Sequence, residues 1–160
     1  MIALRLVRLI ERHSDELTSE LLQKFETSPH TADLRKVPVE ELRQRIQEIF
    51  LNLSEWLLTK TGHDIEQRYF EIGGRRASQG VALPDYCWAM IMTKDHLWEF
   101  LQRQGFMRGP VEIYGEMELL RLLDQFFDRG LCFAAEGYER YSHLQDASES
   151  SGREAQQAAG

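Results

Sequence analysis

The chain has 160 residues, of which 42% are hydrophobic and 28% are charged, as in one globular domain with its own core. Its 4 prolines and 11 glycines are too few for an all-β fold rich in turns. The net charge of -7 disfavours general binding to nucleic acids or to anionic membranes, because both require a basic surface.

The first predicted helix spans about residues 2–26, where apolar side chains recur at helical spacing. Charged residues interrupt its apolar run, which is unlike a signal peptide. No apolar stretch in the chain is long enough to span a bilayer, so we expect a cytoplasmic protein. The expected core face of this helix, with His13 between its members, consists of Leu6, Ile10, Leu17, Leu21 and Phe25.

The second predicted helix begins near Pro38, because proline suits a first helical turn, and it ends at Gly62. A third helix follows, with Asp64 as its expected N-terminal cap. The fourth begins at Pro84 and ends between Gly105 and the pair at 109–110. Its predicted apolar face, which leaves His96 nearly opposite, consists of Cys87, Met90, Ile91, Leu97, Trp98 and Leu101.

The last predicted helix covers residues 111–143 and carries two apolar stripes about 120° apart around its axis. Such a helix is either surrounded by its own chain or faces a partner chain. From residue 144 onward large apolar side chains are nearly absent, which predicts a domain over residues 1–143 and a disordered tail or a linker over 144–160. For the alternative of a homodimer, the candidate interface consists of Leu4, Val7, Leu119, Leu122, Phe126 and Phe133.

Motifs for nucleophilic catalysis, phosphate-binding loops and metal ligation do not occur in the sequence. We therefore predict no catalytic residues, no metal and no cofactor. A sensor that binds a small ligand or haem is the alternative, because a helical histidine on an apolar face could serve as a haem ligand. The candidate pocket for that alternative consists of His13, Tyr69, Trp88 and Met92.

Residues 72–86 read IGGRRASQGVALPDY and combine adjacent glycines with adjacent arginines. A phosphate site at a helix N-terminus would follow a β-strand, but the residues before Gly73 have helical spacing. Close helix packing at the glycines, or a kink there, is the favoured interpretation. Arg75 and Arg76 then lie near a helix C-terminus with Gly80 as the cap, and we expect them to pair with acidic residues of a neighbouring helix or of a partner chain. An enzyme that uses both arginines to bind a phosphorylated substrate is a further alternative.

This junction resembles the RsbT co-antagonist N-terminal domain family. The resemblance is carried by a Gly-Arg-Arg-Ala-x-x-Gly-Val pattern that is followed by a helix start. It covers about residues 3–143, but its specific part is short. The matching residues are Gly74, Arg75, Arg76, Ala77, Gly80, Val81, Leu83 and Asp85.

The resemblance implies an all-α, globin-like bundle without haem, here of about five main helices with a long final helix. It also implies a non-enzymatic, cytoplasmic signal-input domain of a bacterial stressosome regulator or a sensor histidine kinase. Such domains are dimeric and pass a signal to an output domain. No residue of this chain receives a catalytic role from the resemblance.

Overall fold

The computed structural model describes residues 2–104 and 109–159, and within these residues the chain is helical without any strand. The all-α prediction and the long final helix are confirmed. None of the described helices is long and apolar enough to cross a membrane. The elements are α1 (Ile2–Arg12), α2 (Ser14–Thr27), the 3₁₀-helix η1 (Pro29–Lys36), α3 (Val39–Leu51), the π-helix η2 (Glu55–Thr59), α4 (Gly62–Ser78), α5 (Leu83–Arg103) and α6 (Pro110–Ala158).

The single helix predicted over residues 2–26 is two helices that meet at His13. His13 Nδ1 lies 2.9 Å from the carbonyl oxygen of Leu9, and the backbone N–H of His13 donates to the carbonyls of both Leu9 and Ile10. A side chain that enters the hydrogen-bond ladder in this way bends a helix. The break lets α1 and α2 each present an apolar face to the same core.

The start of α4 differs by three residues from the predicted cap. Thr61 is the N-cap, and its hydroxyl accepts a hydrogen bond from the backbone N–H of Asp64. Asp64 in turn accepts from the backbone N–H of Thr61 at 2.8 Å, which completes a capping box. Asp64 therefore supports the helix start from inside the first turn rather than as the cap.

Helix α5 begins at Leu83, one residue before the predicted start at Pro84, but its buried face differs from the predicted one. Ile91, which was predicted for the buried face, is 38% exposed, whereas His96 is only 1% exposed. Thr93 can be buried because its hydroxyl donates to the carbonyl of Ala89 at 2.7 Å. The buried face consists of Tyr86, Ala89, Met90, Thr93, His96, Leu97, Phe100 and Leu101. Gly105, the predicted end of this helix, lies outside the described residues.

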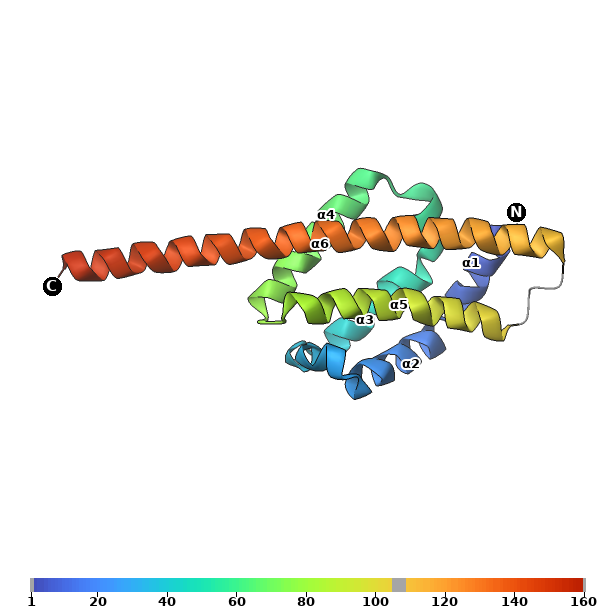
Figure 1. The fold of residues 1–160 in the computed structure, drawn as a ribbon, viewed down its shortest axis with the longest axis horizontal. Helices are drawn as coiled ribbons and strands as arrows, with labels where there is room; N and C mark the ends of the chain where they lie inside the picture. The colour runs from blue at the N-terminus through green and yellow to red at the C-terminus, as the bar shows by residue number, and fades with distance from the viewer. Residues whose placement is uncertain (1, 105–108, 160) are drawn as a thin grey trace.

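Helix α6 continues for 49 residues to Ala158, so the segment after residue 143, predicted to be a disordered tail or a linker, is helical. The near absence of large apolar residues did not reveal this extension of the helix. Alanine, glutamate, glutamine and arginine favour a helix without contributing to a core. The helix runs antiparallel to α5 and then projects beyond the bundle (Figure 1). Every described residue from His143 onward is exposed.

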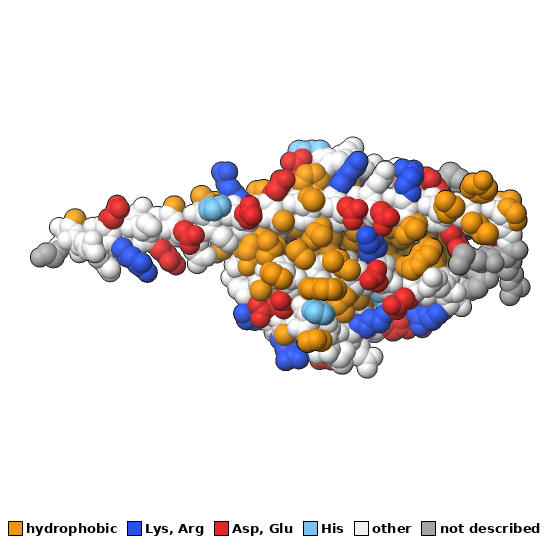
Figure 2. All heavy atoms as spheres, in the orientation of Figure 1, with side chains coloured by type: hydrophobic (Ala, Val, Ile, Leu, Met, Phe, Trp, Pro, Cys, Tyr) orange, Lys and Arg blue, Asp and Glu red, His pale blue; other side chains and the backbone are white. Residues whose placement is uncertain are grey.

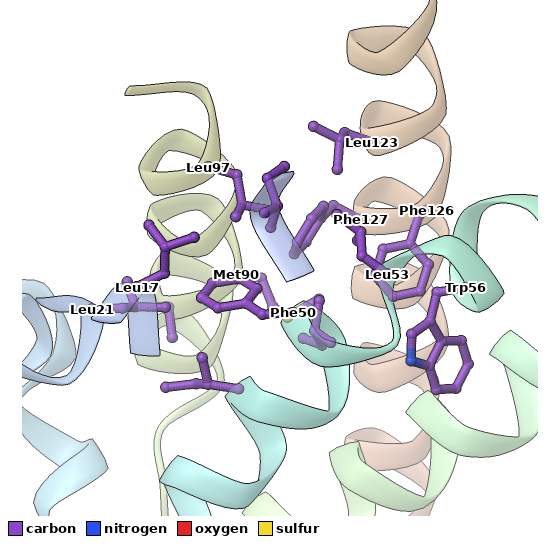
Figure 3. Packing of buried hydrophobic residues seen from close by; sticks show 14 of the residues in the cluster. Leu17, Leu21, Phe50, Leu53, Trp56, Met90, Leu97, Leu123, Phe126 and Phe127 are labelled. Carbon is purple, nitrogen blue, oxygen red and sulfur yellow. The ribbon is translucent and has the colours of Figure 1, made fainter. Parts of the chain in front are cut away.

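The core lies where α2, α3, α5 and α6 converge (Figure 3). Phe50 and Leu53 are fully buried, and Trp56 from η2 packs against Phe126 of α6 with ring centroids 5.6 Å apart. The indole N–H of Trp56 donates to the carbonyl of Glu48 at 3.1 Å, so its polar atom is satisfied inside the core.

Helices α4 and α6 cross in direct backbone contact. A Cβ atom at Gly73 would overlap the backbone of Ala134, and one at Gly137 would overlap the backbone of Phe70. Glycine is therefore required at both positions, and the interpretation of Gly73 as a packing residue is supported. The kink alternative is wrong, because α4 continues without interruption to Ser78.

The two adjacent glycines predict opposite responses to substitution. We expect Gly73→Ala to lower the free energy of unfolding by at least roughly 2 kcal/mol, because backbone atoms of Ala134 cannot yield without separating the helices. A Cβ at Gly74 would meet nothing closer than 3.6 Å, so Gly74→Ala should be neutral or should stabilise by up to about 1 kcal/mol. Urea unfolding of both variants measures the difference, and equal stabilities would contradict the role of this crossing.

Candidate functional site: the arginine groove and the cavity behind it

The candidate site begins where α4 ends. Gly80 has a φ of 73°, its N–H donates to the carbonyl of Ala77, and the N–H of Val81 donates to the carbonyl of Arg76. This pair of bonds is a Schellman motif, which terminates the helix at the predicted glycine. The hydroxyl of Tyr138 in α6 donates to the Val81 carbonyl at 2.7 Å, which ties the junction to the long helix.

Glu41 in the first turn of α3 receives both arginines of the junction. Its Oε1 accepts from Arg75 Nε and from Arg76 Nη1, each at 3.1 Å. Gln79 donates to the other oxygen at 2.8 Å and accepts from Arg76 Nη1 at the same distance. Hydrogen bonds from Arg75 foremost, and then from Arg76 and Gln79, lower the pKa of Glu41 to about 2 against the opposing effect of burial. The arginines thus pair with a neighbouring helix, as expected from the sequence.

A second carboxylate, Glu48, binds two more arginines. Arg68 donates from Nε and Nη2 to its two oxygens, each at 2.9 Å, and Arg45 Nη1 lies 3.1 Å from Oε2. Burial raises the pKa of Glu48, against the opposing charges of Arg45 and Lys60. The pair between Arg68 and Glu48 holds the middle of α4 against α3, whereas Arg45 and Glu48 both belong to α3.

Between these pairs lies a groove of about 250 Å³ on the surface of α3 and α4. Four guanidinium groups and two carboxylates line it, so cations exceed anions along its walls. Its lining residues are Glu41, Arg45, Arg68, Glu71, Ile72, Arg75 and Arg76.

Behind the groove, between α3, α4 and α5, is a smaller cavity of about 50 Å³ with largely apolar walls. Arg45, Ile72 and Arg76 line both spaces, so these three side chains form the boundary between groove and cavity. Tyr69 and Tyr86 line the inner cavity. The arrangement joins a cationic opening to an apolar interior.

The four residues predicted to line one pocket have separate surroundings, and only Tyr69 lines this cavity. His13 packs against Phe100 at the α1–α2 break. Trp88 stacks on His30 at the surface, with ring centroids 4.2 Å apart. Met92 is half-buried. The side-chain hydrogen bond of His13 to Leu9 favours a structural role for this histidine over haem ligation.

His96 was predicted to face away from the core, but it is buried between α2 and α5. Its Nε2 lies 3.0 Å from the carbonyl oxygen of Leu17, and its Nδ1 lies 2.9 Å from Lys24 Nζ. This arrangement fits a neutral ring that donates from Nε2 and accepts at Nδ1. Burial foremost, and then the charge of Lys24, lowers the pKa of His96. Only the proximity of α2, which spacing within one helix does not reveal, could have identified this contact.

The residues predicted for an interface with a partner chain differ in their burial within their own chain. Val7, Leu119 and Phe126 are at most 2% exposed within their own chain, so they present no surface to a partner. The second apolar stripe of α6 is therefore explained in large part by neighbouring helices. The other three, Leu4, Leu122 and Phe133, are half-buried.

Loss of the Glu41 carboxylate should destabilise the fold. We expect Glu41→Gln to lower the free energy of unfolding by roughly 3 kcal/mol, because Arg76 would remain buried without its counter-charge. Folding lowers this pKa from 4.5, so the stabilisation is complete above pH 4.5 and is lost as the pH falls toward 2. The difference between wild type and variant should therefore shrink over that range.

Urea titrations at several pH values measure this dependence. Glu40→Gln is the matched control, because the neighbouring Glu40 side chain is 73% exposed and lies 4.0 Å from Arg43. It should change stability by less than about 0.5 kcal/mol. An equal effect of the two substitutions would rule out a special role for Glu41.

Comparison with known families gives one match, which spans nearly the whole chain. Residues 5–153 match the model of the RsbT co-antagonist protein rsbRD N-terminal domain. No curated protein and no solved structure matches the chain significantly. The match confirms the resemblance predicted from the motif at Gly74–Val81 and indicates a regulatory domain of stressosome-type signal transduction. The chain belongs to the RsbT co-antagonist protein rsbRD N-terminal domain family.

Proposed function

We propose that the chain is a non-enzymatic, cytoplasmic signal-input domain that controls the output of a stressosome regulator or a histidine kinase. The family match supports a regulatory role, and the shape of α6 supports the finer proposal. One helix forms part of the core and also projects from it. A conformational change in the core therefore has a direct mechanical route to whatever the projecting segment contacts.

The observation that carries this proposal is the continuity of α6. Its buried positions run from Gly115 to Gly137, and the helix then continues without a break to Ala158. Figure 2 shows that the projecting end carries charged side chains of both signs and few hydrophobic ones. A continuous helix transmits rotation and translation along its axis, whereas a flexible tail would not.

The α4–α6 crossing is the point where the core can act on this helix. Backbone atoms meet there without intervening side chains, at Gly73 with Ala134 and at Gly137 with Phe70. Packed interfaces of this kind respond to strain by discrete shifts rather than by gradual deformation. A shift of α4 would consequently displace α6.

An insertion series in α6 tests the transmission. The full chain is fused in helical register to the catalytic core of a histidine kinase, and one to seven alanines are inserted after Leu144. We expect autophosphorylation to change at intermediate lengths and to recover at seven residues, because a heptad returns the helix to within about 20° of its original phase. A matched fusion with a Gly/Ser linker after Ala158 should not depend on the insertion length. Equal activity at all lengths of the rigid fusion would rule out signalling through α6.

We also propose that the domain is a homodimer, with the beginning of α6 in the interface. Val111, Tyr114 and Met117 are 64%, 74% and 61% exposed there, and hydrophobic side chains gather at this end of the helix in Figure 2. The basic face of α1 lines a groove together with Glu112 and the buried Glu116 of α6, so in a twofold dimer the arginines of one copy could face Glu112 of the other. The charged residues that line this groove are Arg5, Arg8, Arg12, Glu112 and Glu116.

Light scattering tests the dimer. It should give twice the chain mass at micromolar concentration, and a monomeric mass would contradict the dimer.

A further inference from the structure

The cavity between α3, α4 and α5 contains polar groups that the fold itself does not use. Tyr69 is 3% exposed and Tyr86 is 6% exposed, and both line the cavity. Neither hydroxyl has a hydrogen-bond partner among residues 2–104 and 109–159. No completely enclosed polar side-chain atom in the described part of the chain lacks a partner, so both oxygens retain accessible surface. Both hydroxyls are therefore free to form a hydrogen bond with a molecule in the cavity.

Arg76 adds a third group of this kind. Its side chain is only 3% exposed, and its Nη1 donates to Glu41 and Gln79. No hydrogen bond of its Nε or Nη2 occurs within the described parts of the chain. The buried guanidinium thus has donors to spare at the boundary between cavity and groove.

The three polar side chains all line the cavity. Burial raises the pKa of Tyr86, and the charge of Arg76 opposes this rise, as expected for a guanidinium near that hydroxyl. Burial foremost, and then the proximity of Tyr86, raises the pKa of Tyr69. Both hydroxyls therefore stay protonated at neutral pH and can donate a hydrogen bond.

The remaining walls of the cavity are apolar, so they favour a ligand that also has an apolar part. Ile46, Ile49, Phe25 and Met90 contribute to these walls. A space of about 50 Å³ compares with the roughly 10–15 Å³ that one water molecule needs, so it accommodates about three to four heavy atoms. An apolar tail of that length would fill the space without displacing a core side chain.

We propose that the cavity and the arginine groove form a binding site for a short-chain aliphatic monocarboxylate. The alkyl tail of about three to four carbons occupies the cavity, and the carboxylate accepts hydrogen bonds from Arg76, Tyr86 and Tyr69. The excess of guanidinium groups over carboxylates in the groove attracts the anion to the opening. Only the idea that this ligand is the signal depends on the proposed function, whereas the binding site does not.

Calorimetry on the full chain tests the site with a homologous series of acetate, butyrate, hexanoate and octanoate. We expect the affinity to be highest near butyrate. Butyramide should bind at least about tenfold more weakly, because it lacks the charge that the guanidinium recognises. Inorganic phosphate should also bind more weakly, because it cannot use the apolar walls.

Substitution of one oxygen atom identifies the cavity as the place of binding. Tyr86→Phe should weaken butyrate binding about tenfold, since it removes a hydrogen bond to a charged group. Tyr138→Phe is the matched control, because the Tyr138 hydroxyl donates to Val81 and does not line the cavity, and it should leave the affinity unchanged. If Tyr86→Phe does not fold, Tyr69→Phe gives the same comparison.

Four results would overturn the proposal. They are no binding of any acid up to about 10 mM, equal binding of butyrate and butyramide, unchanged affinity in Tyr86→Phe, and phosphate binding that matches the carboxylates. The last result would indicate an anion site confined to the groove. These results are independent of the insertion series, so a failure of the ligand site leaves the role of α6 standing, and a failure of the insertion series leaves the ligand site standing.

Discussion

The rest of the fold depends on direct backbone contact between α4 and α6. Helices ordinarily pack 8–10 Å apart with side chains between them, and only positions without a Cβ permit a closer approach. Gly73 and Gly137 supply those positions, where they meet Ala134 and Phe70, and Gly130 lies against the ring of Tyr69 beyond these two contacts. Because neither helix can move toward the other, the crossing fixes where the C-terminus of α4 lies.

That fixed position explains the arrangement of charges around the junction. The end of α4 brings Arg75 and Arg76 to the first turn of α3, where Glu41 is favoured by the positive end of the α3 dipole. A carboxylate with three donors stays ionised to low pH, and it can therefore neutralise a guanidinium that the core has almost completely enclosed. The charge cluster is a consequence of the crossing, since without close packing Arg76 would be in water.

The sequence predicted those features that depend on local patterns. The helix start at Pro84, the cap at Gly80 and the packing role of Gly73 each follow from the conformational limits of one residue type. Prediction from the sequence failed where an element far away in the chain decides whether a side chain is buried or lines a cavity. His96 is buried because α2 supplies a carbonyl and Lys24, and Tyr69 and Tyr86 line a common cavity only because α3, α4 and α5 all contribute to its walls. The break at His13 coincides with a hydrogen bond between its side chain and the carbonyl of Leu9, and helical spacing does not encode that bond.

A ligand in the cavity would act on the same crossing through Arg76. This residue lies in the wall shared by the groove and the cavity, on the last turns of α4, three residues after Gly73. A carboxylate at its free donors would compete with or reinforce the bonds to Glu41, and either change alters how α4 is held between α3 and α6. The free energy by which the ligand shifts α6 can be no larger than the difference between its binding free energies for the two positions of α4. Such differences are about 1–3 kcal/mol in known allosteric proteins. Backbone atoms of α4 and α6 are in direct contact at the crossing, and no side chains lie between them that could change rotamer instead. Even a small movement of α4 would therefore displace α6 and its projecting segment.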